Sequence, residues 1–182
     1  MTPGRRTLEY ATFDDIHADV DQLVGGCSTV GSWTLGQILH HLATVTNRVL
    51  AAPVDGPHDT SLRATPERRD HVLATGELPE GIPLPGGLGQ PEDVDPREGA
   101  RMLRESLAAM AAAPGPLAPH RIFGPLDRDQ WRRLVCIHCA HHLSFAAPAA
   151  AVAGGRPPPG SVNGRCPSPR RRSSPRRARC RA

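Results

Sequence analysis

Four segments of the sequence combine apolar residues at helical spacing with a capping residue before them and a helix-breaking residue after them. These signals predict four long helices, over Phe13–Val24, Leu35–Ala51, Pro96–Ala113 and Arg128–Ala146. Each is preceded by a side chain that can accept hydrogen bonds from the first turn, namely Thr12, Thr34, Asp95 and Asp127. Because each helix can bury one apolar stripe against the others, the pattern favours an all-α fold.

The connections between these helices predict how they are arranged. A shorter helix is expected over Pro66–Thr75, and Gly76 ends it. The stretch Glu77–Val94 that follows is rich in proline and glycine, so it cannot form regular structure. We therefore predict a four-helix bundle with one long crossover loop between its second and third long helices. Loops of this length often serve as lids over functional sites.

The charged residues divide the chain into two unequal parts. Residues 1–153 hold 13 arginines and all 18 acidic residues, whereas residues 154–182 hold nine arginines and no acidic residue. We predict a folded, acidic domain over 1–153 and a disordered arginine- and proline-rich tail over 154–182. An acidic body argues against nucleic-acid binding through the folded domain. One reading of the tail is a contact for RNA or for an anionic surface. The reading we favour is a non-functional extension or a frameshifted end.

Five of the nine histidines fall in two of the predicted helices, as His40, His41, His138, His141 and His142. His138 and His142 are four residues apart and share one helix face, while His41 lies on the inward apolar stripe of its own helix. Two imidazoles at this spacing and a third from a neighbouring helix can converge on one ion and leave coordination positions open. We predict a divalent-metal site at His41, His138 and His142, and Zn²⁺, Ni²⁺ and Fe²⁺ all suit imidazole.

Two alternatives at this site stay open. His141 lies about 60° from His138 around the helix, on the other side, so it competes with His142 as a ligand. The three histidines could equally be hydrogen-bonded core residues without a metal. Cys136 and Cys139 form a C-x-x-C pair, a spacing that can indicate redox or zinc chemistry. Because the pair lies inside a helix and not at its N-terminus, we interpret both as small packing residues.

The two histidine-bearing segments resemble signatures of a known superfamily. Gly31–Ala43, with the sequence GSWTLGQILHHLA, is similar to the second-helix signature of the DinB-like (YfiT-like) metalloenzymes, and Ile137–Phe145, IHCAHHLSF, is similar to their last-helix signature. This resemblance implies a four-helix bundle that holds a divalent metal, often nickel or zinc, through three histidines. It places the ligands at His41, His138 and His142.

A narrower resemblance points to one branch of that superfamily. The sequence from Phe123–Leu126 to Trp131, followed by the HxxHHLSF run and preceded by Leu78–Gly81, is similar to domain-of-unknown-function family 1569. The resemblance covers about Arg6–Pro148. Relatives in the superfamily include thiol-dependent transferases and isomerases that use bacillithiol, mycothiol or glutathione-like cosubstrates, whereas the branch itself has no assigned reaction.

Three functional hypotheses follow. The first is a metal-dependent thiol transferase or hydrolase-type enzyme that acts on a small molecule, with a low-molecular-weight thiol as cosubstrate. The second is a non-catalytic metal-binding or stress-response bundle protein. The third is an RNA- or membrane-associated protein that acts through its arginine-rich tail.

The cellular setting is expected to be the cytoplasm. No apolar run approaches the roughly 20 residues that span a membrane. The polar stretch Met1–Tyr10 lacks the apolar segment of a signal peptide. We therefore expect no membrane partner for the folded domain. A homodimer is the assembly to test, because dimers are common among bundles of this kind.

Overall fold

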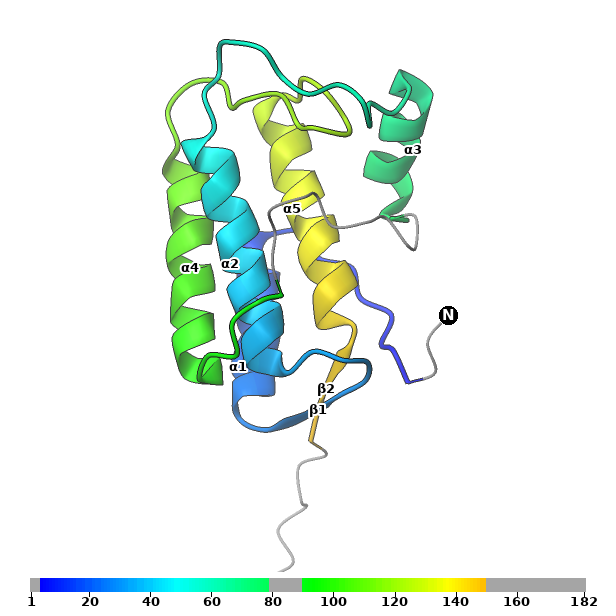
Figure 1. Cartoon of the computed structure of the whole chain (residues 1–182). Coiled ribbons are helices and arrows are strands. Elements are labelled where there is room, and N and C mark those ends of the chain that lie inside the picture. The colour runs from blue at the N-terminus through cyan, green and yellow to red at the C-terminus, as the bar shows by residue number, and fades with distance from the viewer. Residues whose placement is uncertain (1–3, 79–89, 150–182) are drawn as a thin grey trace, which may run out of the picture. The chain divides into compact units, whose positions relative to one another are not determined.

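The computed structural model describes residues 4–78 and 90–149. In this part of the chain the protein is mainly helical, with five helices and a small two-stranded sheet (Figure 1). The helices are α1 (Phe13–Val24), α2 (Leu35–Ala51), α3 (Pro66–Thr75), α4 (Pro96–Ala112) and α5 (Arg128–Leu143), and the strands are β1 (Cys27–Thr29) and β2 (Ala146–Pro148).

The predicted helix starts are confirmed, and each has the expected cap. Reciprocal capping boxes join Thr12 to Asp15, Thr34 to Gln37 and Asp127 to Gln130. Asp95 accepts hydrogen bonds from the backbone at the start of α4. The ends of α1, α2 and α3 also agree with the prediction, and α4 ends one residue earlier than expected.

The predicted C-terminal end of the last helix is wrong. α5 ends at Leu143, and β2 then pairs antiparallel with β1, so that Cys27 faces Pro148 and Thr29 faces Ala146. The Val30 amide extends this pairing by donating to the Phe145 carbonyl at 2.7 Å. Backbone groups after α5 therefore find their partners in the α1–α2 connection. That partner is distant in sequence, so local helix signals could not reveal it.

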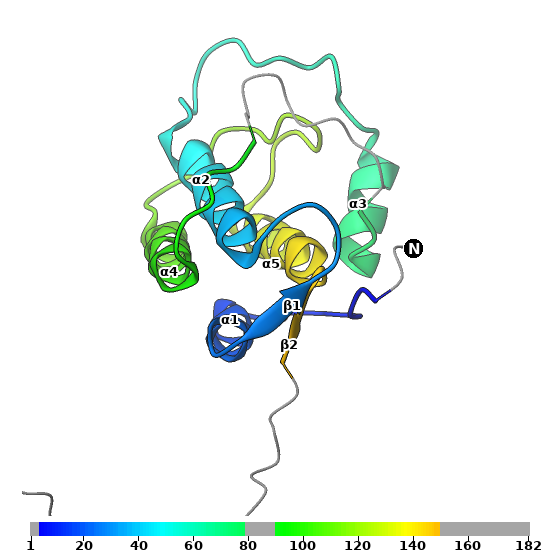
Figure 2. The same cartoon turned by 60° about the horizontal axis from the view of Figure 1, so that its bottom comes forward.

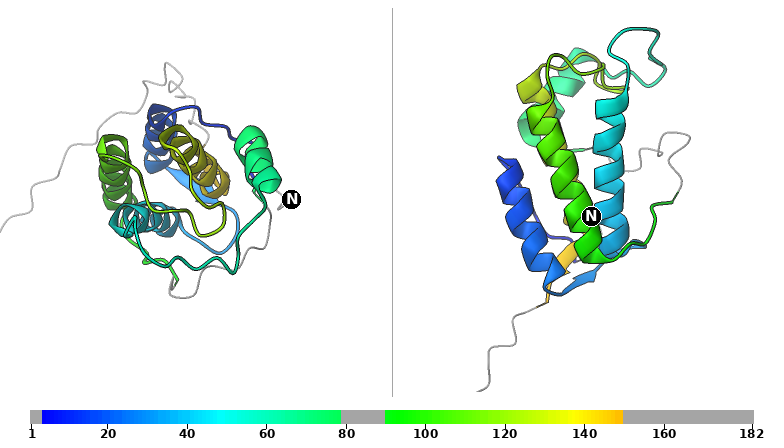
Figure 3. Two further views of the ribbon diagram at one scale, coloured as in Figure 1. Left: turned by 90° about the horizontal axis from the view of Figure 1, so that it is seen from above. Right: turned by 90° about the vertical axis from the view of Figure 1, so that its left-hand side faces the viewer.

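The four long helices run side by side (Figures 1 and 2). Their apolar stripes are buried against one another. α2 makes its most extensive contact with α4, while α5 contacts both α1 and α2. The largest fully buried side chains come from every one of these helices and include Ile16, Leu39, Leu107 and Leu143. α3 lies apart from α2 and α4, on the far side of α5, which is the helix it contacts (Figure 3).

Most of the predicted crossover Glu77–Val94 lies outside the described residues. Its return end is described and docks on the first turn of α2, where the Gln37 side-chain amide donates to the Pro91 carbonyl at 3.2 Å. A Cβ at Gly36 would lie 1.9 Å from the Val94 carbonyl oxygen, so only glycine permits this approach. The glycine therefore lets the crossover close directly onto the helix that carries His41.

The segment before α1 is tied to the end of α5. The Arg6 amide donates to the Ser144 carbonyl at 2.9 Å, and its guanidinium forms a bidentate pair with Asp19 at 2.7 and 2.8 Å. Tyr10 donates to the same carboxylate at 2.6 Å. Burial acts to raise the pKa of Asp19, but the hydrogen bonds from Arg6 and Tyr10 outweigh it and hold the pKa below its usual value. This network fixes the residues around Arg6 beside the last turn of α5.

Two sequence predictions concern the C-terminal part of the chain. The predicted disordered tail over 154–182, and the domain boundary at Ala153, lie outside the described residues. Among the helices of the described part, none is long and apolar enough to cross a membrane.

The contact between α2 and α4 depends on a second glycine, which generates a stability prediction. A Cβ at Gly99 would lie 2.8 Å from Leu39 Cβ and 3.3 Å from Val94 Cγ2. Overpacking of this kind costs about 1–3 kcal/mol, whereas alanine gains roughly 1 kcal/mol over glycine in helix propensity. We expect Gly99→Ala to lower the free energy of unfolding by about 1 kcal/mol, as measured by urea denaturation.

A matched control lies on the exposed face of the same helix. Ala108→Ser should change the free energy of unfolding by no more than about 0.5 kcal/mol, as is usual for surface substitutions. If Gly99→Ala were instead more stable than the wild type, the close approach of α2 and α4 would be contradicted.

Candidate metal centre

The three predicted histidines come together between α2 and α5. One ring nitrogen from each of His41, His138 and His142 lies within 4.8 Å of the others. The ring centroids are 5.3 Å apart for His41 and His138, 4.5 Å for His41 and His142, and 4.7 Å for His138 and His142. Three nitrogens at about 2.1 Å from one Zn²⁺ lie roughly 3.4 Å apart. The group could therefore hold a metal ion after a small closure of its side chains.

Helix geometry explains why these residues meet. His41 lies on the buried stripe of α2 and is only 5% exposed. His138 and His142 lie one turn apart on α5, so their side chains stack along one face. The contact between α2 and α5 then brings the two faces together. Two rigid helices therefore position all three imidazoles.

Burial keeps these imidazoles neutral. It lowers the pKa of His41 to about 4 and the pKa of His138 to about 3, and it lowers the pKa of His142 further. The neighbouring histidines act in the same direction, because each disfavours a positive charge on the others. Neutral imidazole is the form that binds metals. All three nitrogen donors are therefore available at neutral pH.

Trp33 is a member of the site that the sequence prediction missed. Its indole stacks on the His142 ring, with centroids 5.6 Å apart and planes 9° apart, and it lies 5.1 Å from the His41 ring at a tilt of 52°. Trp33 directly precedes Thr34, the cap of α2. The sequence offered one hint of this role, which is that Trp33 lies next to the capping residue of a helix that carries histidines. Only the fold shows that its indole packs on the rings of His41 and His142.

His141 and His142 were alternative third members of the predicted histidine group, and the structure places them differently. His142, and not His141, joins His41 and His138 in the group that could hold an ion. The His141 ring lies beside it, 5.0 Å from the His142 ring and 5.9 Å from the Phe145 ring. His40 is half-buried, and its Nδ1 accepts a hydrogen bond from the Glu92 amide at 3.3 Å.

The C-x-x-C pair lies in the core. Cys136 and Cys139 are each 1% exposed and belong to the main apolar cluster. Burial raises the pKa of Cys136 to about 11 and raises that of Cys139 further. Thiols that stay protonated are poor nucleophiles and poor metal ligands. These observations agree with a packing role for both residues.

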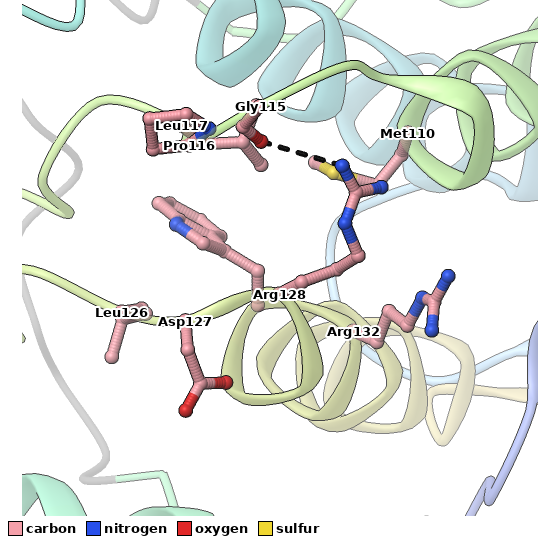
Figure 4. Close-up of a pocket in the computed structure, with 9 residues that line it drawn as sticks. Met110, Gly115, Pro116, Leu117, Leu126, Asp127, Arg128 and Arg132 are labelled. Carbon is pink, nitrogen blue, oxygen red and sulfur yellow. Dashed lines mark hydrogen bonds between the residues drawn. The ribbon is translucent and has the colours of Figure 1, made fainter.

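A cavity of about 250 Å³ lies at the opposite end of α5 from the histidines (Figure 4). Met110, Leu117, Leu126 and Trp131 supply most of its apolar lining. At its edge the Arg128 guanidinium donates to the Gly115 carbonyl at 3.3 Å. None of the three clustered histidines lines it, so this cavity is separate from the candidate metal centre.

A family model described as "Protein of unknown function (DUF1569)" matches residues 3–149. The chain belongs to this family. The DUF1569 match spans every described helix and strand and all three clustered histidines, and it confirms the narrower of the two resemblances. No curated protein and no solved structure matches the chain.

The buried imidazoles of this DUF1569 protein should make its metal-free form sensitive to acid. The unfolded chain takes up protons on histidine below about pH 6.5, whereas folded His41 and His138 resist protonation down to about pH 4 and pH 3. Stability is therefore complete above pH 6.5 and falls as the pH is lowered towards 4. Between pH 7 and pH 5 each such imidazole should cost about 1–2 kcal/mol in the free energy of unfolding.

Urea denaturation with a chelator present, at pH 7 and pH 5, measures this loss. His138→Leu should reduce the difference between the two pH values, while His71→Gln, at an exposed position, should leave it unchanged. A difference in His138→Leu as large as in the wild type would show that this imidazole is not held neutral by the fold.

Proposed function

We propose that this DUF1569 protein is a DinB-like four-helix bundle that binds a divalent metal ion through His41, His138 and His142. We further propose that it is a metal-dependent enzyme of the transferase or hydrolase type, acting on a small molecule. The observation that carries the proposal is the convergence of three imidazoles, one buried and two half-buried, with one ring nitrogen of each within 4.8 Å of the others.

The chemistry of the three imidazoles favours metal binding over a purely structural role in the core. A neutral imidazole carries one proton and one free lone pair, so three of them can point one acceptor nitrogen each at a common centre. Acceptor nitrogens that face one another cannot hydrogen-bond to each other, so they need a shared proton donor or cation between them. A divalent cation satisfies all three at once, and imidazole suits zinc, nickel and iron.

The distribution of ligands over the helices supports the DinB-like assignment. His41 lies on the second long helix, and His138 and His142 lie on the last, which is the distribution that the superfamily resemblance implies. The crossover that returns to the first turn of α2 also belongs to that plan. A low-molecular-weight thiol as cosubstrate is the corresponding proposal for the reaction.

The chain's own residues would prepare the site for reaction. An ion on three nitrogen ligands supplies an open coordination position and lowers the pKa of a water or thiol. The rigid helices fix the donors, and Trp33 shields His142 from solvent on one side. Consumption of a low-molecular-weight thiol with an electrophile by the metal-loaded protein, and its loss in His138→Ala, would test the enzymatic part of the proposal.

Metal content provides the direct test of the site. We expect the purified wild type to retain about one equivalent of a divalent metal by elemental analysis. The metal should be lost in each of the variants His41→Ala, His138→Ala and His142→Ala. Loss of a residue that only supports a ligand lowers metal affinity by roughly 10–100-fold, and loss of a ligand itself should lower it further.

Two control variants sharpen that comparison. His71→Ala, at an exposed position, should keep the metal. His141→Ala should also keep it, since His141 lies outside the clustered group. Equal and negligible metal content in the wild type and all variants would contradict the proposal. Loss of metal in His141→Ala, with metal retained in His142→Ala, would show that His141 and not His142 is the third ligand.

The two tryptophans allow metal binding to be followed in solution. Trp33 stacks on His142, whereas Trp131 lies two turns away from His138 on α5. In a Trp131→Phe background, titration of the metal-free protein with Ni²⁺ or Co²⁺ should quench the remaining fluorescence by more than about half, because these open-shell ions quench by contact. A much smaller change in Trp33→Phe would verify the location, and equal quenching in the two variants would argue against it.

A further inference from the structure

The three histidines of the proposed site are oriented by ring contacts and not by hydrogen bonds. In most metal sites a ligating histidine donates its second ring N–H to a carboxylate, a carbonyl oxygen or water, and that contact fixes the ring. In the described part of the chain, no protein group hydrogen-bonds to the rings of His41, His138 or His142. The protein itself therefore orients these rings by packing.

Trp33 is an aromatic residue that contacts one histidine on each of the two helices. Its indole is stacked on the His142 ring of α5, with centroids 5.6 Å and planes 9° apart. It also lies 5.1 Å from the His41 ring of α2, at a tilt of 52°. Both separations fall within the roughly 4.5–7 Å at which aromatic rings attract one another. Rotation of either imidazole would disturb this contact, so Trp33 restrains both.

The backbone around Trp33 is held on both sides. Before it, the Val30 amide donates to the Phe145 carbonyl at 2.7 Å. After it, Thr34 caps α2, and its hydroxyl donates to Asp93 Oδ1 at 2.5 Å. The indole itself is half-buried and packs against the main apolar cluster. Trp33 therefore presents a fixed surface to the two histidines.

This restraint bears directly on metal binding. A side chain that is already held close to its bound orientation loses less conformational freedom when a ligand binds. The three ligand nitrogens lie within 4.8 Å of one another, so binding needs only a small closure of the rings. Without the indole, the His41 and His142 rings could turn away from the common centre, and an ion would have to reorder them.

We propose that Trp33 is a positioning residue of the metal site, which orients His41 and His142 by aromatic stacking in place of hydrogen bonds and so raises the affinity for a divalent ion. This role goes beyond shielding from solvent, because it requires a planar ring at this position. The inference rests on the proposed function, because it requires that the ion binds to the three histidines.

The test compares a planar and a non-planar replacement of the indole. The full-length protein is freed of metal with a chelator and titrated with Co²⁺, whose visible absorption bands report affinity and ligand geometry. We expect Trp33→Leu to weaken binding about tenfold, since two ring contacts are lost and each changes an equilibrium constant by a few-fold. Its bands should also differ from those of the wild type. Trp33→Phe keeps a planar ring, so it should retain most of the affinity and the wild-type bands.

Two controls separate positioning from general stability. Trp131→Phe changes the other tryptophan, two turns before His138 on α5, and should leave Co²⁺ affinity unchanged. Should Trp33→Leu not fold, proton NMR of the metal-free wild type tests the stacking directly. The ring signals of His142, identified by their loss in His142→Ala, should be shifted upfield by the indole, and unshifted signals would contradict the proposal.

The outcomes distinguish this inference from the function on which it rests. If the wild type binds no Co²⁺ through its histidines, the proposed function fails and this inference fails with it. If Co²⁺ binds and Trp33→Leu has the affinity of the wild type, the metal site stands and the positioning role is overturned. Equal weakening in Trp33→Leu and Trp33→Phe would also overturn it, because planarity would then have no effect.

Discussion

The close packing of α2 is the constraint on which the rest of the described structure depends. Gly36 lets the return of the crossover reach the first turn of this helix, and Gly99 lets α4 approach Leu39. With α2 held on these sides, its remaining buried stripe faces α5 and carries His41 with it. Packed interiors transmit small changes in volume because they contain few voids. A methyl group at either glycine would therefore push against a segment that packs on α2, the helix that carries His41.

The end of α5 is held by segments from elsewhere in the chain. β1 pairs with β2 directly after the helix, and the segment around Arg6 hydrogen-bonds to the carbonyl of Ser144. These contacts bring Trp33 and Arg5 to the last turn of α5, where His142 lies. A small sheet and a polar anchor thus hold the end of the helix that carries His138 and His142.

The electrostatics of the cluster link its stability to its proposed chemistry. Burial and the neighbouring imidazoles disfavour protonation of the three clustered rings, which costs the metal-free protein stability in acid. The same environment keeps their lone pairs free for a cation at neutral pH.

The sequence by itself determined the helices and which of their faces are buried. Caps such as Thr34 and Asp127 act within a few residues, and the spacing of His138 and His142 places them on one face wherever α5 packs. It could not determine that α5 stops at Leu143, because the strand that takes over its backbone groups lies between α1 and α2. Nor could it show that His142, and not His141, clusters with His41 and His138, or that Trp33 stacks on His142. Those outcomes depend on how α5 is rotated against α2 and on contacts between distant segments, and only the packing of the whole domain decides them.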